Sequence, residues 1–218
     1  MRSLESTAEP SILPGPVRVV VRSKAQCVGD PRLLDFDCGR SPATAEVRMI
    51  VENLYSGDAL EQTVAMLTDD GTGELLGIAS VRVDGNAQIR SKSSTPWFLR
   101  RLAGNPYVNV VARDERFRNR LLCDGRTRLG AVLVRAAVEV IEHELPDGPT
   151  PTIWALIRRH NLASKRAFRQ LAFYPHSRSA ENQQDVFVRR AGRVLPAAPE
   201  SGAYLPPLSS RQMEHLTA

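Results

Sequence analysis

Apolar positions recur with two different periods along the chain, and these periods predict most of its secondary structure. From Leu129 to Val140 they follow one another at intervals of three and four residues, the spacing of one face of an α-helix. A second helix is predicted over 161–172, and a third runs from an N-cap at Ser41 or Thr44 to a stop at Gly57. Shorter runs rich in β-branched residues predict strands at 17–22, 63–67, 75–83, 107–111, 153–157 and 185–189.

The order of these elements predicts the fold class. The Asp-Asp-Gly-Thr-Gly stretch at 69–73 is a turn signal that joins two of the strands into a hairpin. An antiparallel sheet that leads into strand–helix–strand–helix is typical of an α+β or mixed α/β sandwich. Residues 85–105 show no period and are expected to be irregular. We expect one domain over 17–190, with tails at 1–16 and 191–218 that are rich in Pro, Ser, Ala and Gly.

A loop rich in Gly and Arg lies before the longest helix. It reads Gly125, Arg126, Thr127, Arg128, Leu129 and Gly130, and it leads directly into the helical pattern. The first amides of a helix have no partner within the helix, and the helix dipole favours negative charge at that end. A strand followed by such a loop and a helix start therefore predicts a site for a ligand that carries a pyrophosphate.

The segment 107–173 resembles the core of the GCN5-related N-acetyltransferase (GNAT) superfamily. In that family a strand ends in an apolar tripeptide, and a basic loop of the form Arg/Gln-x-x-Gly-x-Gly/Ala and a long helix follow. A second strand, an Asn, and a helix with a Tyr before a closing Gly-Phe complete the pattern. This chain has Val111-Ala112-Arg113, the loop 125–130, Asn161, Phe168 and Ala172-Phe173 in the same order.

The resemblance implies a mostly antiparallel twisted sheet with a splayed parallel pair, flanked by helices. It also implies transfer of an acetyl group from acetyl-CoA to a primary amine by direct attack, without a metal. The backbone of Val111 and Arg113 would hold the pantetheine, as an added strand pairs with a sheet edge. The amides from Arg126 to Ala131 would bind the pyrophosphate. The cofactor-binding residues expected in this way are Val111, Ala112, Arg113, Arg118, Gly125, Arg126, Thr127, Arg128, Leu129, Gly130, Ala131, Asn161 and Phe168.

The chain departs from the family pattern at several positions, among them Arg113 in place of an apolar residue and a short insertion at 120–124. Gly125 replaces the leading Arg or Gln, and Arg128 replaces a Gly, where its guanidinium could instead meet the phosphates. Shifting the register to use Arg126 would place Arg135 on the core face of the helix, so that alignment is rejected. Phe168 stands at the position of the Tyr that protonates the departing thiolate.

Three residues are therefore the candidates selected for the proton chemistry: Tyr174 and Ser164 as proton donors and Glu115 as a base, with Asp114, His160 and His176 as alternative bases. A further reading of Asn161 is that of a helix N-cap with no other role.

The distribution of basic residues indicates a second class of acceptor molecule, a nucleic acid. Between positions 90 and 128 ten basic residues stand against three acidic ones, within a chain of net charge +5. Such a basic patch attracts polyanions, and tRNA is one alternative partner. The segment Phe36-Asp37-Cys38-Gly39 resembles the leading segment of acetyltransferase toxins that modify aminoacyl-tRNA. A module that binds CoA without catalysis is the alternative from another functional class.

Composition sets the cellular context. No apolar run approaches the roughly 20 residues that cross a bilayer, and the first residues lack the apolar core of a signal peptide. We therefore expect a cytoplasmic protein with no membrane partner, and a homodimer stays open. Cys27, Cys38 and Cys123 are widely spaced, without a CxxC pair, which favours free thiols over disulfides or a zinc site.

Overall fold

A computed structural model gives the structure of the chain. It describes residues 12–39, 44–86, 89, 95–146, 148–179, 183–196 and 204–205. In chain order the elements are β1 (Val17–Ser23), α1 (Lys24–Cys27), α2 (Pro31–Leu34), α3 (Ala45–Ser56), β2 (Thr63–Asp69), β3 (Leu75–Arg82), α5 (Trp97–Leu102), β4 (Tyr107–Arg113), η2 (Glu115–Phe117), α6 (Leu129–Glu144), β5 (Thr152–Arg158), α7 (Leu162–Gln170), β6 (Tyr174–Ser179), β7 (Gln184–Arg190) and β8 (Tyr204–Leu205).

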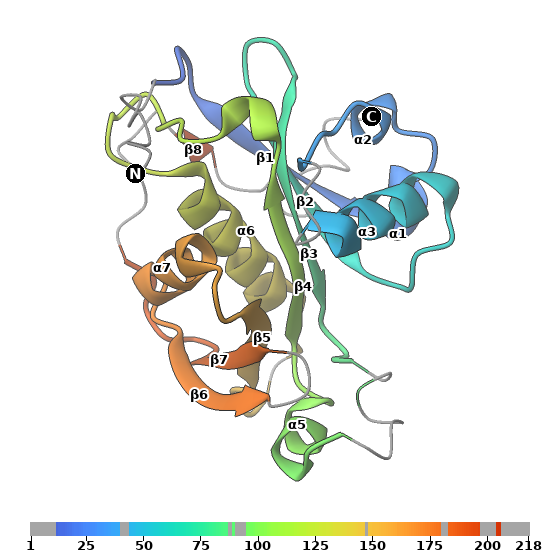
Figure 1. The fold of residues 1–218 in the computed structure, drawn as a ribbon, viewed down its shortest axis with the longest axis vertical. Helices are drawn as coiled ribbons and strands as arrows, with labels where there is room; N and C mark the ends of the chain where they lie inside the picture. The colour runs from blue at the N-terminus through green and yellow to red at the C-terminus, as the bar shows by residue number, and fades with distance from the viewer. Residues whose placement is uncertain are drawn as a thin grey trace, which may run out of the picture.

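One sheet forms the middle layer of the molecule. Its strands lie in the order β6-β7-β5-β4-β3-β2-β1-β8. Most neighbours are antiparallel, whereas β4 and β5 are parallel, as are β1 and the two residues of β8. Helices α6 and α7 cover one face, and α1, α2 and α3 cover the other (Figure 1). This arrangement confirms the predicted fold class, including the parallel pair in the centre of the sheet.

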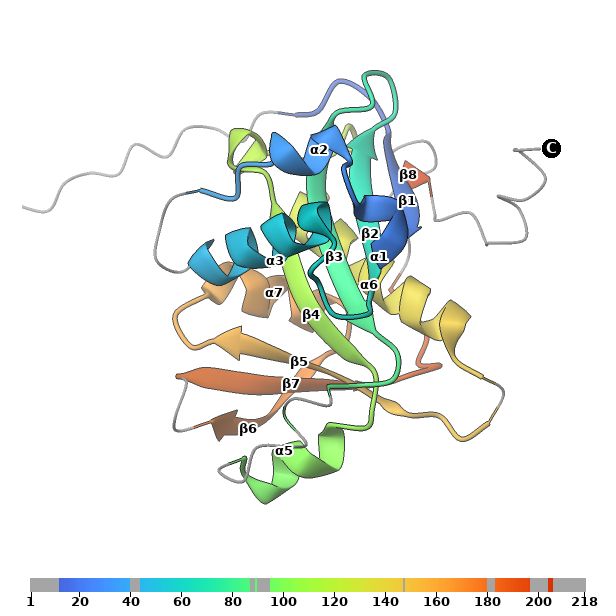
Figure 2. The ribbon, with the colours of Figure 1, turned by 90° about the vertical axis from the view of Figure 1, so that its right-hand side faces the viewer.

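Strand β4 departs from its neighbour β5 after a short common stretch. The two strands pair only at Tyr107–Trp154 and Val108–Ala155. On its other side β4 pairs with β3 as far as Arg113, with an irregularity that leaves Asn109 as an extra residue. Such a bulge bends a strand and increases its twist. Beyond Val108 the strands diverge, so the β5-facing edge of the last residues of β4 has no strand partner in the described part of the chain (Figure 2).

Helix α6 packs tightly on the sheet. The apolar residues of its predicted face are buried and belong to the main hydrophobic cluster of the protein. Leu133 lies directly over Gly77 of β3. A Cβ atom at Gly77 would come within 2.7 Å of Leu133 Cδ1 and 2.8 Å of the Ala112 carbonyl oxygen. The absence of a side chain at Gly77 therefore lets the helix approach the strand that ends in the site.

The helix register agrees with the prediction, but Arg135 is buried nevertheless. Its side chain is covered by the segment after β7, where Arg135 Nη2 donates to the carbonyl oxygen of Pro196. The same guanidinium pairs with Glu139 (Nη1–Oε1, 3.4 Å). Burial of Arg135 therefore comes from a covering segment and not from the core face, a distinction that helix periodicity does not make.

Parts of the expected tails have defined structure. Leu13 is buried, and its amide donates to the Leu121 carbonyl oxygen (2.9 Å). Leu195 packs against the main cluster, and the backbone of Tyr204–Leu205 pairs with β1. Among the described residues, no helix has both the length and the apolar character to cross a membrane.

Three segments differ from the predicted secondary structure. The region expected to be irregular contains α5, which Leu99 and Leu102 anchor to a small cluster with Trp154. Strand β6 was not predicted, because His176 and its polar neighbours give no apolar alternation. The short helices α1 and α2 were also missed. Helices of four residues are too short to show a period.

Candidate functional site

A cleft of about 410 Å³ opens where β4 leaves β5. One wall consists of the end of β4, the turn after it, and the first turns of α6 and α7. The opposite wall consists of Cys38, Thr44 and Val47, next to the N-terminus of α3. Of the expected cofactor-binding residues, those that line the cleft are Val111, Ala112, Arg113, Arg118, Arg128, Gly130, Ala131, Asn161 and Phe168.

The N-terminus of α6 borders the cleft and offers it the amide of Gly130. Arg128 is the N-cap, with an extended backbone (φ −89°, ψ 141°) and no capping side-chain hydrogen bond. The position therefore needs no left-handed conformation, and an arginine is accommodated without strain. The Ala131 amide donates back to the Arg128 carbonyl oxygen (3.0 Å). Within the described residues, the amide of Gly130 has no acceptor and can receive an anion, whereas the Leu129 amide faces Arg120 across the bridge between Leu121 and Arg128.

The loop before α6 satisfies its own amides. Asp124 Oδ1 accepts from the amides of Arg126 and Thr127 (both 2.8 Å), and Asp124 Oδ2 accepts from the Thr127 hydroxyl. Burial alone would raise the pKa of Asp124, but these hydrogen bonds outweigh burial and lower it. Gly125, with φ +66°, turns the chain at this point. This is an Asx-turn, and the spacing of Asp124 before Arg126 and Thr127 is its sequence signal.

The cleft consequently does not present the full row of amides, from Arg126 to Ala131, that the family resemblance implies for the pyrophosphate. Gly125, Arg126 and Thr127 do not line it, and the Leu129 side chain is buried in the core. Two of the amides assigned to the pyrophosphate are engaged by Asp124.

Arginine side chains bring positive charge to the cleft. Arg113 is half-buried and has no hydrogen-bond or ion-pair partner among the described residues. Burial lowers the pKa of Arg113 and the nearby charges of Arg118 and Arg128 lower it further, whereas the charge of Glu115 opposes them in part. Arg118 pairs with Glu115 (Nη1–Oε1, 2.8 Å) and is largely exposed. A half-buried guanidinium beside two other cations is electrostatically unfavourable without an anion. The site therefore has the charge of an anion-binding pocket.

Helix α7 and its N-cap bring two notable residues to the cleft: Asn161, which caps the helix, and the aromatic residue Phe168. Asn161 Oδ1 accepts from the Ser164 amide (3.0 Å), so Asn161 is an N-cap that also lines the cleft. Phe168 is only 3 % exposed and packs edge-to-face on Phe173, with ring centroids 4.9 Å apart. It lies at the floor of the cleft without a hydroxyl group.

The three candidates for proton transfer are not equivalent. Ser164 and Glu115 line the cleft, and the Glu115 carboxylate is engaged by Arg118. Tyr174, at the start of β6, is 51 % exposed and does not line it. The structure thus brings two of the three to the cleft.

The opposite wall was only indicated by the short segment 36–39. Cys38 in this segment is buried and lines the cleft, and the next residue, Gly39, has φ +86°. The Gly39 carbonyl oxygen accepts from Thr44 Oγ1 (2.7 Å) and Arg48 Nη1 (2.6 Å), which ties the segment to the start of α3. Thr44 and Val47 were not predicted as site residues. Their sequence signal is that of a helix start, which is shared by helices with no site.

The face of the sheet that carries α3 has its own charged contact. Glu46, in the first turn of α3, pairs with Arg158 at the end of β5 (Oε2–Nη2, 3.5 Å). Burial raises the pKa of Tyr107 at the start of β4, and the charge of Glu46 adds to this. This ion pair connects the first turn of α3 with the end of β5.

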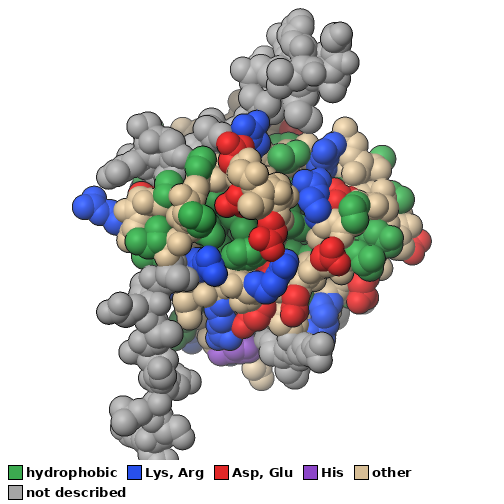
Figure 3. All heavy atoms as spheres, turned by 90° about the horizontal axis from the view of Figure 1, so that it is seen from above, with side chains coloured by type: hydrophobic (Ala, Val, Ile, Leu, Met, Phe, Trp, Pro, Cys, Tyr) green, Lys and Arg blue, Asp and Glu red, His purple; other side chains and the backbone are tan. Residues whose placement is uncertain are grey.

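The basic residues expected as one patch are divided in space. Arg90 and Lys92 lie outside the described residues. Arg100 and Arg101 belong to α5, before the first residue of β4, whereas Arg113 and the arginines after it lie at the other end of that strand (Figure 1). Seen from above, acidic and basic side chains alternate on the surface (Figure 3). The high local count of basic residues therefore does not correspond to one surface.

Comparison with solved structures gives similarities of fold. A bacterial toxin matches with a TM-score of 0.51 at 16 % identity, over 81 % of this chain and 92 % of the toxin. NAA60 of Arabidopsis thaliana in complex with acetyl-CoA matches with a TM-score of 0.45 at 11 % identity, over 79 % of this chain and 98 % of NAA60.

A Bordetella pertussis protein of the GnaT acetyltransferase family matches with a TM-score of 0.40 at 20 % identity. The match covers 58 % of this chain and 63 % of that relative, which is less than two thirds of its length. No protein-family model and no curated protein matches the sequence. The match to the bacterial toxin is thus a similarity of overall fold.

Proposed function

We propose that this GNAT-like fold binds acetyl-CoA in the cleft between β4 and β5 and transfers the acetyl group to a primary amine. The observation that carries the proposal is the edge of β4 beyond Val108, which pairs with no strand in the described part of the chain and leads to the N-terminus of α6. A pantetheine arm has amide groups that pair with such an edge as an added strand does. The backbone of Val111 and Arg113 is assigned this role.

The phosphates of the ligand are assigned to side chains more than to loop amides. Arg113, Arg118 and Arg128 supply the charge, and the amide of Gly130 supplies a donor at the helix N-terminus. The amides of Arg126 and Thr127 are left out of this assignment because Asp124 engages them. Asn161 and Phe168 border the remaining length of the arm.

The reaction assigned to this site is direct attack of the amine on the thioester. A backbone amide at the end of β4 would donate to the carbonyl oxygen as negative charge develops there. The amine must be neutral, which an α-amino group with a pKa near ~8 achieves far more readily than a lysine near ~10.4. Ser164, whose residue lines the cleft, is assigned the role of passing a proton to the departing sulfur. The thiol pKa near ~8.5 also permits departure as the thiolate.

An aminoacyl-tRNA acceptor is a second candidate, favoured by the position of Cys38. The segment 36–39, which carries the sequence likeness to acetyltransferase toxins, forms a wall of the cleft. Acetylation of a charged tRNA would weaken steeply as salt rises, because phosphate contacts release counterions. Acetylation of a small amine would depend little on salt.

Release of free CoA tests the proposal. The purified chain is incubated with acetyl-CoA and a panel of amines that includes amino acids, peptides with free N-termini and aminoacyl-tRNA. Liberated thiol is followed over time, and the product is identified by mass spectrometry. We expect thiol release that depends on one class of amine. Binding of acetyl-CoA without release on any member of the panel would contradict the enzymatic role and favour a regulatory module.

A further inference from the structure

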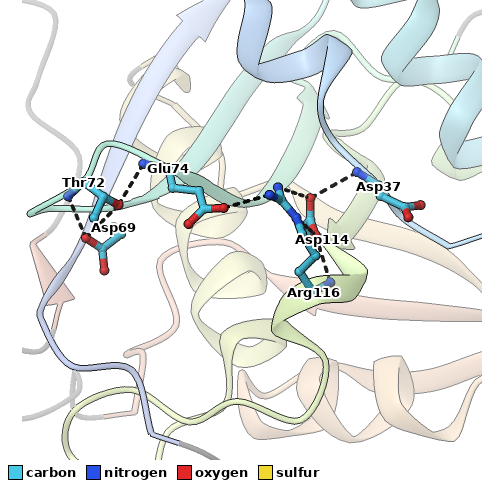
Figure 4. A network of polar contacts seen from close by, with 6 residues as sticks. All are labelled: Asp37, Asp69, Thr72, Glu74, Asp114 and Arg116. Carbon is cyan, nitrogen blue, oxygen red and sulfur yellow. Dashed lines mark hydrogen bonds and ion pairs between the residues drawn. The ribbon is translucent and has the colours of Figure 1, made fainter.

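A buried carboxylate joins the two walls of the cleft. Asp114 directly follows β4, and its side chain is fully buried. The carboxylate accepts from the amide, Nε and Nη2 of Arg116, each at 2.9 Å, and Oδ2 also accepts from the Asp37 amide at 3.1 Å (Figure 4). Three of the four contacts shape the turn after β4. The fourth reaches a segment 77 residues away in sequence.

Hydrogen bonds to both the amide and the carbonyl group of Asp37 hold the segment 36–39 in place. The Asp37 amide donates to Asp114, and the Asp37 carbonyl oxygen accepts from the amide of Glu115. One residue further on, Cys38 lines the cleft, and the Gly39 carbonyl oxygen is tied to Thr44 and Arg48. A chain of hydrogen bonds thus runs from the end of β4 through Asp37 to the first turn of α3.

Arg116 completes the support on the outside. Its Nη1 pairs with Glu74 of the β2–β3 connection at 2.9 Å, while its other donors face Asp114 (Figure 4). The Asp114 amide itself donates to the Leu76 carbonyl oxygen (2.9 Å), which continues the contact with β3. The backbone of the cofactor wall is therefore held by the sheet independently of the Asp114 carboxylate. In the described part of the chain, the wall at 36–39 pairs with no strand, and the bond from the Glu115 amide to the Asp37 carbonyl oxygen is its one backbone hydrogen bond to the end of β4 and the turn after it.

We propose that Asp114 is a positioning residue that holds the cleft wall at 36–39, which contains Cys38, at a fixed distance from the end of β4. In this way it orients the acceptor amine toward the thioester. The inference rests on the proposed function for its catalytic consequence, but the clamp itself is a property of the folded chain. Asp114 touches neither substrate in this scheme. It acts through the backbone amide of Asp37.

The clamp is tested by the reactivity of the Cys38 thiol. In a Cys123→Ser background the two other thiols are buried, and burial raises the pKa of Cys27 to about 11, so both react slowly while the wall is closed. We expect Asp114→Asn to speed modification of Cys38 by about tenfold or more, because a lost charge-assisted hydrogen bond shifts a local opening by that order. Peptide mapping assigns the modified cysteine.

The matched control is Asp69→Asn. Asp69 is also buried, and its Oδ1 accepts from the amides of Gly71 and Thr72 and from the Thr72 hydroxyl. It shapes the β2–β3 turn in the way that Asp114 shapes the turn after β4, but it has no contact with the segment 36–39. Asp69→Asn should destabilise its turn while the Cys38 rate stays unchanged. Equal Cys38 rates in wild type, Asp69→Asn and a folded Asp114→Asn would overturn the proposal.

A second variant keeps the test decisive if Asp114→Asn does not fold. Arg116→Gln removes the donors that orient the carboxylate but leaves the Asp37 contact possible. It should raise the Cys38 rate by a smaller factor. No increase in folded Arg116→Gln would then count against the clamp.

Steady-state kinetics separate positioning from general damage. For folded Asp114→Asn we expect a higher KM for the amine and a lower kcat, with acetyl-CoA affinity changed by less than about twofold. An equal loss of affinity for both substrates would indicate general damage and contradict the positioning role. If wild type fails to bind acetyl-CoA while the Cys38 rates behave as expected, the proposed function fails and the clamp stands.

Discussion

The two walls of the cleft are built in different ways. The cofactor wall is a strand and two helices: β4 pairs with β3 to its last residue, and α6 is anchored over Gly77 by Leu133. The opposite wall, which contains the segment 36–39 beside the start of α3 and is called the α3 wall below, is a short irregular segment. Side chains hold it, among them Asp114, Thr44 and Arg48. Many backbone contacts hold the cofactor wall in place, whereas hydrogen bonds of a few polar groups hold the α3 wall.

This difference predicts different responses to substitution. Ladder hydrogen bonds do not depend on side-chain identity, so the cofactor wall should keep its shape through most surface changes. A wall fixed by single carboxylate and hydroxyl groups should open when one of them is removed, because each buried polar group then loses its partner. Substrate binding and substrate orientation should therefore be separable by mutation.

The largest effect is expected from breaking the core beneath the cofactor wall. Leu133→Ala removes a fully buried side chain packed on Gly77, and should lower the free energy of unfolding by about 2–5 kcal/mol. Urea denaturation followed by circular dichroism measures this. Leu60→Ala, at a position that is 46 % exposed, is the control and should change the value by less than about 0.5 kcal/mol.

Next in size is an added negative charge at the helix N-terminus. Gly130 lines the cleft, and a Cβ there would meet only Ala167 Cβ at 3.9 Å. Gly130→Glu should weaken acetyl-CoA binding about 100-fold, or about 2.7 kcal/mol, because a carboxylate would face the phosphates. Gly130→Ala should bind almost as wild type does. Equal affinity of the Glu and Ala variants would place the phosphates elsewhere.

A smaller effect is expected from removing one cation of the same wall. Arg113→Gln should weaken acetyl-CoA binding about tenfold, or about 1.4 kcal/mol, and lessen its dependence on salt. The comparison with Arg101→Gln, on α5, separates a local contact from a change in net charge. Similar losses in both variants, measured by calorimetry at two salt concentrations, would show that only net charge matters.

The smallest effect concerns the α3 wall and pH. Burial alone would raise the pKa of Asp114, but hydrogen bonds from Arg116 and Asp37 lower it below its usual value. A lowered native pKa stabilises the protein above the unfolded pKa of about 3.9 and loses this effect as pH falls through the native value. The stability difference between wild type and Asp114→Asn should therefore shrink on acidification. Urea titrations from neutral to acidic pH test this, and a constant difference would refute it.

The regular elements of the cofactor wall could be predicted because they follow a period. The spacing from Leu129 to Val140 placed α6, and Asn161 placed the start of α7. Such patterns report which face of an element is buried. They also led to a family pattern whose fold the structure has.

The remaining features depend on contacts that have no period. Asp124 engages loop amides through an Asx-turn, and its pattern was overlooked beside the stronger Gly/Arg signal. The Asp114–Asp37 contact joins residues that only the folded chain brings together. Arg135 is buried because a segment 61 residues later covers it. Long-range polar contacts of this kind are specified by tertiary structure.

Calorimetric titration of the wild-type chain with acetyl-CoA tests the central claim most directly, with 3′-dephospho-CoA and free CoA as comparison ligands. We predict saturable binding of one acetyl-CoA per chain, similar binding of free CoA, and binding that weakens as salt rises because Arg113, Arg118 and Arg128 meet the phosphates. No heat of binding at millimolar acetyl-CoA, in a sample shown to be folded, would contradict the assignment of the cleft.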